Sequence, residues 1–149
     1  MFHYLRGMRS IILIILSLSA LSLSAQGNWK LLSNVEILTR MDGERGYEIS
    51  YPKFGDSVLK LDHQSITLKG YMIPLDDMIG QRYFVLSALP YNICFFCGGA
   101  GPETVAEVKT KSEVRFTDDA ITVRGILKLN PDDPDHLMYI VEEAEIINP

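Results

Sequence analysis

Apolar residues at every second position dominate the chain from residue 66 onward, and this alternation constrains the fold more than any other feature. The run from Ala120 to Leu129 is the clearest case, because its apolar side chains would share one face: Ile121, Val123, Leu127 and Leu129. The run from Ile66 to Leu75 repeats the pattern, with Ile66, Leu68 and Met72 on one face. A period of two residues is that of a half-buried β-strand, and no run shows the 3.6-residue period of a helix.

Five strand-like runs follow one another with polar connections and no crossover helix: Ile66–Leu75, Tyr83–Leu89, Thr104–Lys111, Ala120–Leu129 and Leu137–Ile147. Strands connected in this way pair antiparallel. Gly70 and Gly125 interrupt the inward faces of two strands, which indicates bulges or sharp bends. We therefore predict an all-β fold, a small OB-like, partly open antiparallel barrel, with a β-sandwich as the alternative.

Three of these runs allow more specific predictions. Tyr83–Leu89 is apolar on both faces and should be buried on both, whereas Thr104–Lys111 is more polar and should be more solvated. In Leu137–Ile147 the even positions carry the apolar face: Met138, Ile140, Ala144 and Ile146.

An additional hairpin is expected before the barrel. Val35–Leu38 and Tyr47–Tyr51 are strand-like, and the segment between them contains Asp42-Gly43, a dipeptide typical of hairpin turns. This extra N-terminal hairpin would extend or cover the barrel.

The first 25 residues have the layout of a secretory signal peptide. Arg6 and Arg9 precede an apolar stretch from Ile11 to Leu23, and Ala25 supplies a small residue at the cleavage position. The stretch is shorter than the ~20 apolar residues of a membrane span, which disfavours an uncleaved anchor. We therefore expect export to the periplasm or the medium, with residues 26–149 forming a single β-barrel domain.

The charge balance excludes some classes of partner. Without Arg6 and Arg9 the chain would carry 12 basic and 19 acidic residues, a formal charge of −7. A nucleic acid or an anionic membrane surface requires a basic face, so neither is expected as a partner. We also expect no stable membrane insertion after cleavage.

The strongest functional candidates are the only two cysteines, Cys94 and Cys97, which lie in a glycine- and proline-rich segment from Pro90 to Pro102. In an oxidising compartment such a pair most often forms a disulfide, which is the structural interpretation. The alternative is a metal site. A C-x-x-C followed by Gly98-Gly99 resembles half of a zinc knuckle, and its thiolates would equally suit Cu(I).

Thiol–disulfide exchange is the third interpretation of the pair. A redox C-x-x-C gains its reactivity at the N-terminus of a helix, which lowers the pKa of the first thiol. The glycines that follow Cys97 disfavour a helix at this position.

Other candidate ligands are weaker. His63 and His136 lie in polar turns, where a solvated histidine is the ordinary case, but either is a candidate further metal ligand. The acidic loop with Asp132, Asp133 and Asp135 lacks the calcium-loop spacing. No catalytic motif is present, so the sequence predicts no catalytic residue and leans against an enzyme.

Three segments of the sequence share a pattern with a known family: Gly70-Tyr71-Met72-Ile73-Pro74-Leu75, Phe84-Val85-Leu86-Ser87 and Val123-Arg124-Gly125-Ile126-Leu127. With the cysteine segment between the second and the third, they resemble a bacterial family of small exported proteins that is known only as a domain of unknown function. The resemblance runs from about Trp29 to the C-terminus. It implies an OB-like barrel and, because members are often encoded near transition-metal ABC transport systems, a supporting role in metal handling. Some members have one cysteine in this segment rather than two. The resemblance therefore extends to Cys94, whereas Cys97 departs from the family pattern.

These observations lead to a functional hypothesis with two alternatives. The first is an exported, non-enzymatic binding or accessory protein that handles a transition metal such as zinc through Cys94 and Cys97, with a metal transport system or another exported protein as its partner. The alternatives are a thiol–disulfide protein, in which Cys94 attacks and Cys97 resolves, and a structural adaptor with an inert loop disulfide.

Overall fold

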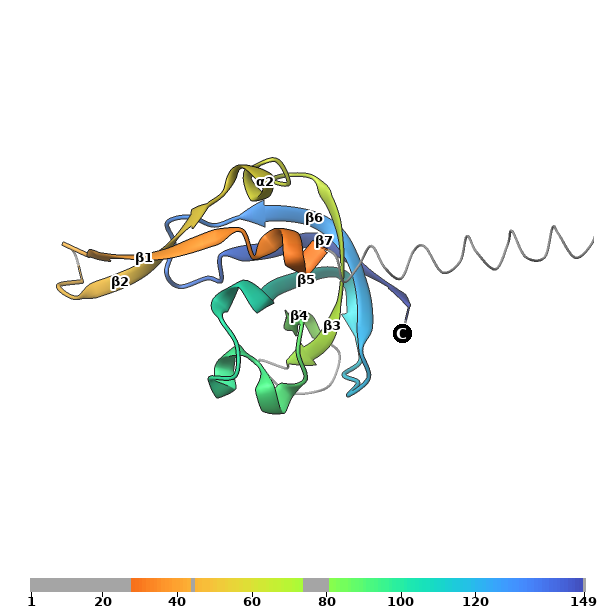
Figure 1. The fold of residues 1–149 in the computed structure, drawn as a ribbon. Helices are drawn as coiled ribbons and strands as arrows, with labels where there is room; N and C mark the ends of the chain where they lie inside the picture. The colour runs from red at the N-terminus through yellow and green to blue at the C-terminus, as the bar shows by residue number, and fades with distance from the viewer. Residues whose placement is uncertain (1–27, 44, 74–80, 149) are drawn as a thin grey trace, which may run out of the picture.

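A computed structural model describes residues 28–43, 45–73 and 81–148 (Figure 1). Five strands form a closed barrel in the order β3-β4-β5-β7-β6: β3 Ser65–Ile73, β4 Gln81–Ser87, β5 Val105–Val114, β6 Ile121–Leu129 and β7 Tyr139–Asn148. A separate two-stranded sheet, β1 Val35–Met41 with β2 Glu48–Phe54, precedes it. The all-β class, the five-stranded barrel and the extra N-terminal hairpin are confirmed.

The barrel differs from the predicted one in two respects. It is closed, because β3 pairs with both β4 and β6, so it is neither partly open nor a sandwich. It is also mixed, because β5 and β7 pair in parallel while the other barrel pairs are antiparallel. Adjacent strands in the sequence indicate antiparallel hairpins, but the pairing of β5 with β7 joins strands that β6 separates, and no local pattern reports it.

Gly70 marks the place where the barrel closes. Residues Ser65 to Gly70 of β3 pair with β6, and Tyr71 to Ile73 pair with β4. A Cβ atom at position 70 would collide with the carbonyl oxygen of Ser87, so only glycine lets β3 pass this close to the end of β4. The predicted sharp bend at Gly70 is therefore a change of strand partner.

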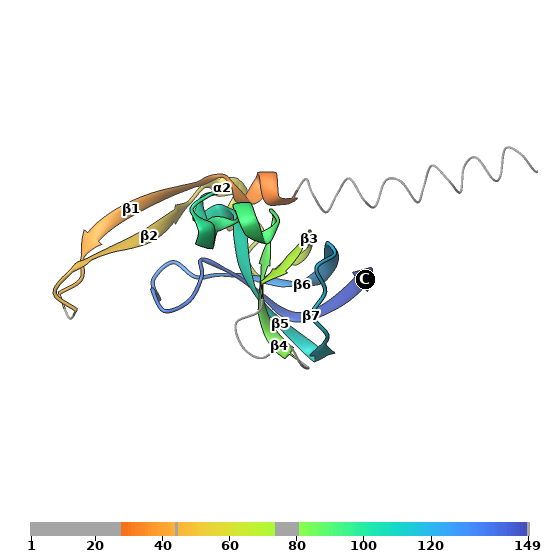
Figure 2. The same ribbon diagram turned by 90° about the horizontal axis from the view of Figure 1, so that it is seen from below.

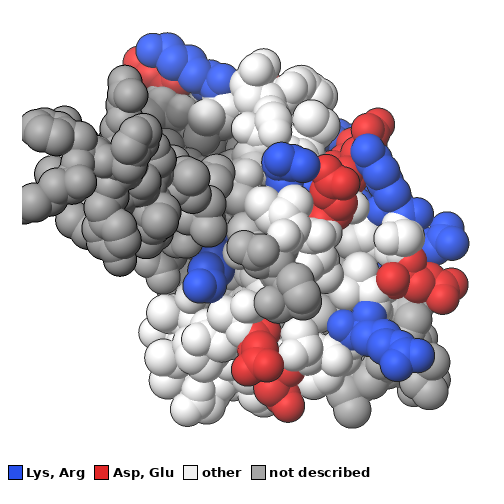
Figure 3. Space-filling model, turned by 90° about the vertical axis from the view of Figure 1, so that its right-hand side faces the viewer, with Lys and Arg blue, Asp and Glu red and all other residues white. Residues whose placement is uncertain are grey.

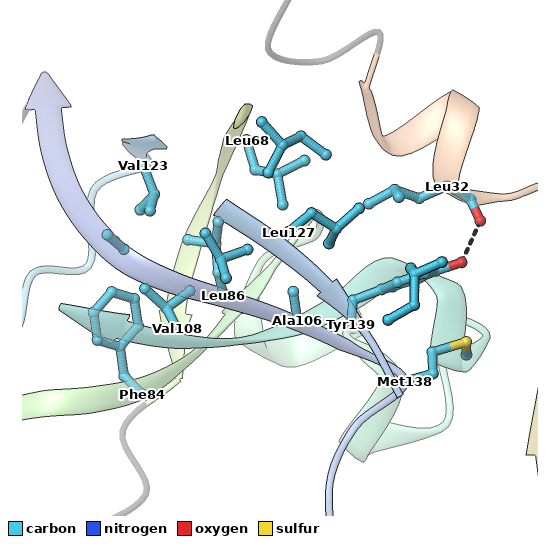
Figure 4. Close-up of a cluster of buried hydrophobic side chains, with 14 of the residues drawn as sticks. Leu32, Leu68, Phe84, Leu86, Ala106, Val108, Val123, Leu127, Met138 and Tyr139 are labelled. Atoms are coloured by element: carbon cyan, nitrogen blue, oxygen red, sulfur yellow. Dashed lines mark hydrogen bonds between the residues drawn. The ribbon is translucent and has the colours of Figure 1, made fainter. Parts of the chain in front are cut away.

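The barrel interior holds the main hydrophobic core (Figure 4). Its buried side chains alternate along the strands, as with Ile66 and Leu68 on β3 and Phe84 and Leu86 on β4. The hydroxyl of Tyr139 donates a hydrogen bond to the carbonyl oxygen of Leu32, which joins helical residues 28–32 to the barrel end (Figure 4). Burial raises the pKa of Tyr139, so the phenol remains a donor.

A bulge in β7 changes which positions face inward. Tyr139 and Val141 lie in the core in the first half of the strand, and Ala144 and Ile146 pack in or against it in the second half. The register with β6 shifts between these halves, and Glu143 adopts a φ of 50°. The bulge lies opposite Gly125. Of the predicted even positions, Met138 (just before β7) and Ala144 are in the main core and Ile146 packs against it, whereas Ile140, before the bulge, is buried outside it.

The β1–β2 hairpin projects from the barrel and curves back toward the loop that joins β6 to β7 (Figures 1 and 2). The guanidinium of Arg45 in its turn lies 2.9 Å from the carboxylate of Asp135 in that loop. A short helix, α2 Asp56–Leu59, returns the chain to the barrel and buries Val58 in the core.

The surface drawn in Figure 3 carries basic and acidic side chains close to one another, with no broad patch of one sign among the coloured residues. Ion pairs between strands produce this kind of mixture, as with Arg124–Glu145 at 3.0 Å across β6 and β7. Residues 1–25, where the sequence predicts a signal peptide, lie outside the described residues. In the part of the chain that the structure describes, no helix has the length and apolar character that crossing a membrane requires.

Candidate functional site

The cysteine loop, residues Pro90–Pro102, connects β4 to β5 and is built from single turns of 3-10 helix: η1 Tyr91–Ile93, η2 Phe95–Cys97 and η3 Pro102–Thr104, the last continuing into β5. Gly98 ends the second turn in the left-handed conformation, at a φ of 76°. A Cβ atom at Gly99 would collide with the carbonyl oxygen of Ile93. The two glycines thus fold the loop tightly back on itself, and residues 90–102, all of them described, contain no α-helix.

Cys94 is fully buried between the loop and the outer surface of the barrel. Its side chain belongs to a small second hydrophobic cluster that contains Ile73, Val85 and Val105, with Phe95 and Leu137 packed against it. This cluster explains why β4 is buried on both faces from Phe84 to Ser87: Phe84 and Leu86 face the core, and Val85 lies beneath the loop. Tyr83, which was expected to be buried as well, is 37% exposed.

Cys97 is exposed, and both cysteines are free thiols. The Sγ of Cys97 donates a hydrogen bond to the carbonyl oxygen of Tyr91 over 3.0 Å, which requires a protonated thiol. Loss of hydration, followed by hydrogen bonding to Cys94, raises the pKa of the Cys97 thiol. The pair is therefore a dithiol with one accessible sulfur and one covered sulfur, in contact with each other.

A buried carboxylate lies on the same outer face of the barrel. Glu107 of β5 is 3% exposed and accepts a hydrogen bond of 2.6 Å from the backbone N–H of Leu137. The Nδ1 of His136 lies 3.0 Å from its Oε2. Burial, and then hydrogen bonding to Glu107, raises the pKa of Tyr83 to about 12. Glu107 thus ties the β6–β7 loop to β4 and β5.

The contact with Glu107 orients the ring of His136. When Nδ1 donates to the carboxylate, the neutral imidazole presents Nε2 as an acceptor or a metal ligand, an arrangement common behind metal-binding histidines. The side chain of His136 is 42% exposed, so this nitrogen is within reach of a ligand.

An open groove of about 460 Å³ lies between the hairpin, the cysteine loop and the β6–β7 loop. Phe95 and Pro102 line it from the cysteine loop, His136 from the β6–β7 loop, and Tyr47 and Tyr51 from the hairpin. A second cavity of about 540 Å³ is lined by Tyr71, Met72, Pro90, Tyr91, Asn92, Phe116 and Asp118. The cysteine loop therefore contributes residues to both cavities.

The predicted ligands do not converge. His136 shares the groove with the cysteine loop, whereas His63 lies in the turn after α2, where its backbone N–H donates to Leu127 and its side chain is 73% exposed. Within the described ranges, no group of three or more His, Cys, Asp or Glu side chains is close enough to hold a metal ion. The thiols of Cys94 and Cys97 are the soft ligands that the site offers.

Glu107 was not anticipated from the sequence. The third barrel strand was expected to be more solvated than the others, but Val105 to Val108 are all buried. The only available signal was a single acidic residue between apolar neighbours, Ala106 and Val108. Its burial arises from the loops that cover it, which strand periodicity cannot show.

Fold and site together define a small all-β barrel protein with a dithiol loop on its outer face. No protein-family model matches the chain, and no curated protein does. Among solved structures, the chain is similar to the crystal structure of a DUF3299 family protein (PA4066) from Pseudomonas aeruginosa PAO1, with 20% identity and a TM-score of 0.44. The match covers 60% of this chain and 65% of that protein, so the chain spans less than two thirds of its neighbour.

Proposed function

We propose that the protein is an exported, non-enzymatic binding protein that presents Cys94 and Cys97 to a soft transition-metal ion such as zinc, as an accessory to a metal transport system or another exported protein. The observation that carries this proposal is the state of the two thiols. They are free, they contact each other, and Cys97 is accessible at the surface. Thiols in this arrangement suit Zn²⁺ or Cu(I) once they are deprotonated.

The donor set supports a shared site. Zn²⁺ is usually bound by four ligands, and the two sulfurs would supply two of them. No group of three possible ligands exists among the described residues. A molecule that delivers or accepts the ion would supply the remaining ligands, which suits an accessory protein. His136 is better prepared than His63 as a further ligand, because Glu107 already orients its ring.

Zinc binding to the purified, reduced protein tests the proposal. Free thiols and bound metal are measured on the same sample, before and after titration with zinc in competition with a chromophoric chelator. We expect stoichiometric zinc with protection of both thiols, and an affinity that rises with pH because each thiol must lose its proton. Metal-free, fully oxidised protein that binds no zinc after reduction would overturn the proposal.

Variants identify the ligands. Cys97→Ser should abolish zinc binding, whereas His63→Ala is a matched control that should bind as the wild type does, because His63 lies apart from the cysteine loop. His136→Ala tests whether a further zinc ligand comes from His136 or from the partner. Weaker binding makes His136 a ligand, and unchanged binding leaves the open positions to the partner. Wild-type zinc affinity in Cys97→Ser would contradict a site at the thiol pair.

Thiol–disulfide exchange is the second candidate, and the exposure of Cys97 favours it. The burial of Cys94 reverses the expected roles, so Cys97 would meet the substrate and Cys94 would resolve the mixed disulfide. The raised pKa of Cys97 works against a reactive thiolate. A disulfide with an oxidising reduction potential would favour this function, and a pair that resists reduction would favour the structural adaptor.

A further inference from the structure

The outer edge of β1 is an open strand edge. Among the described strands, β1 pairs only with β2, and their hairpin projects from the barrel (Figures 1 and 2). Ile37 and Met41 of this strand are 41% and 66% exposed. An exposed edge of seven residues without proline or lysine is a template for pairing with another strand.

The hydrogen bonds of the hairpin decide which groups face outward. The N–H of Asp42 donates to the carbonyl oxygen of Tyr47, and hydrogen-bonded pairs alternate with non-hydrogen-bonded pairs along an antiparallel ladder. Even-numbered residues of β1 therefore bond to β2. The free backbone donors and acceptors of β1 point outward at the odd positions: Val35, Ile37, Thr39 and Met41.

The outer edge of β2 is blocked. The same alternation directs the backbone nitrogen of Pro52, which has no hydrogen to donate, away from β1. The hairpin thus offers one usable edge and protects the other.

The sequence of β1 is complementary to itself in the antiparallel direction. Placing a two-fold axis at Leu38 sets Ile37 opposite Thr39 of a second copy, and Val35 opposite Met41, so all the outward-facing groups find partners. The same register sets Glu36 opposite Arg40 twice, once on each side of the axis. Shifting the axis by one residue either way would lose this charge match.

The two charged residues are available for this role. Glu36 lies 3.5 Å from Lys53, and Arg40 lies 3.5 Å from Asp132. All four side chains in these ion pairs are 45–75% exposed. Exposed pairs of this kind contribute little, so re-pairing across a new strand interface is readily accommodated.

We propose that the protein forms a two-fold symmetric homodimer through β1, in which the β1 strands of two copies pair antiparallel about Leu38. The result is a continuous four-stranded sheet in the order β2-β1-β1-β2, with a barrel at each end. Pairing with a second copy also covers the open edge of β1, so that it is no longer exposed to solvent. The interface is small, so the dimer dissociates on dilution.

Sedimentation velocity over a range of concentrations tests the dimer. Thr39→Pro removes an outward-facing N–H from the β1 edge without touching the β1–β2 ladder, and it should weaken dimerisation at least about tenfold. Ser50→Pro is the matched control, because Ser50 lies opposite Thr39 and directs its N–H to the outer edge of β2. This variant should dimerise as the wild type does.

A charge exchange tests the register. Glu36→Arg places like charges opposite each other twice and should also weaken the dimer at least about tenfold. Combining it with Arg40→Glu restores both opposite-charge pairs and should recover dimerisation. A wild-type protein that stays monomeric at every concentration would overturn the proposal. So would a dimer that tolerates both Thr39→Pro and Glu36→Arg, because its interface would lie elsewhere.

Discussion

The Nδ1 of His136 lies 3.0 Å from the Oε2 of Glu107, a carboxylate that is 3% exposed on the outside of the barrel. The two residues are 29 positions apart and come from β5 and the β6–β7 loop. Their contact places His136 in the groove beside the cysteine loop. A buried carboxylate is tolerated when hydrogen-bond donors surround it, as the Leu137 N–H and the His136 ring do here. Without the carboxylate, these donors would lose their acceptor.

Removing the carboxylate should therefore destabilise the fold. Glu107→Ala leaves the backbone N–H of Leu137 without its acceptor, and we expect a loss of about 1–3 kcal/mol in the free energy of unfolding. Urea denaturation measures this change. Glu145→Ala is the control, because its ion pair with Arg124 is about half exposed, and it should change stability by about 0.5 kcal/mol or less. Equal losses in the two variants would contradict the structural role of Glu107.

Alkaline pH should weaken a different contact of Glu107, its hydrogen bond with the phenol of Tyr83. The folded protein raises the pKa of Tyr83 from 10.0 to about 12, so the neutral phenol is the favoured form. Its contribution to stability is complete below pH 10 and is lost as the pH rises from 10 to about 12. The free energy of unfolding, measured across this range, should fall more steeply in the wild type than in Tyr83→Phe. Parallel pH profiles of the two proteins would show that ionisation of Tyr83 does not affect stability.

The sequence predicted most of the fold because strand alternation is a local property. Ile66, Leu68 and Met72 were placed on one face and are buried together in the core. Ile140 was placed on the wrong face because the bulge at Glu143 reverses the alternation of β7. Gly125, which lies opposite, indicated a bulge or bend but not that the extra residue belongs to β7. The parallel pairing of β5 with β7 was missed because it depends on how the barrel closes.

The site was less predictable for a similar reason. Both cysteines were identified from their spacing, but only packing against Val85 and Val105 makes Cys94 the covered thiol. Nothing near His136 in the sequence indicates Glu107, which approaches it only because β5 and the end of the β6–β7 loop are neighbours in the barrel. Sequence thus reports residue types, and topology decides which of them meet.

The two thiols should differ sharply in reactivity. Cys97 is exposed and Cys94 is fully buried, so a maleimide or iodoacetamide reagent should modify Cys97 first and Cys94 only in denaturant. Because the pKa of Cys97 is raised, its alkylation rate should continue to rise with pH beyond the ordinary thiol pKa of about 8.5. Mass spectrometry of the modified peptides measures both effects. Preferential labelling of Cys94 would contradict the burial of that thiol.

The close turn at Gly99 should control access to Cys94. In Gly99→Ala the new methyl group collides with the carbonyl oxygen of Ile93, so the loop must shift, at an expected cost of about 1–3 kcal/mol in unfolding free energy. Because the N–H of Gly99 also donates to the carbonyl oxygen of Cys94, the shift should expose that thiol and speed its alkylation in the native protein. Gly43→Ala is the control, since no atom lies within 4 Å of its Cβ position, and it should leave stability and thiol access unchanged. If Gly99→Ala kept Cys94 unreactive at full stability, the loop would be held by contacts other than this turn.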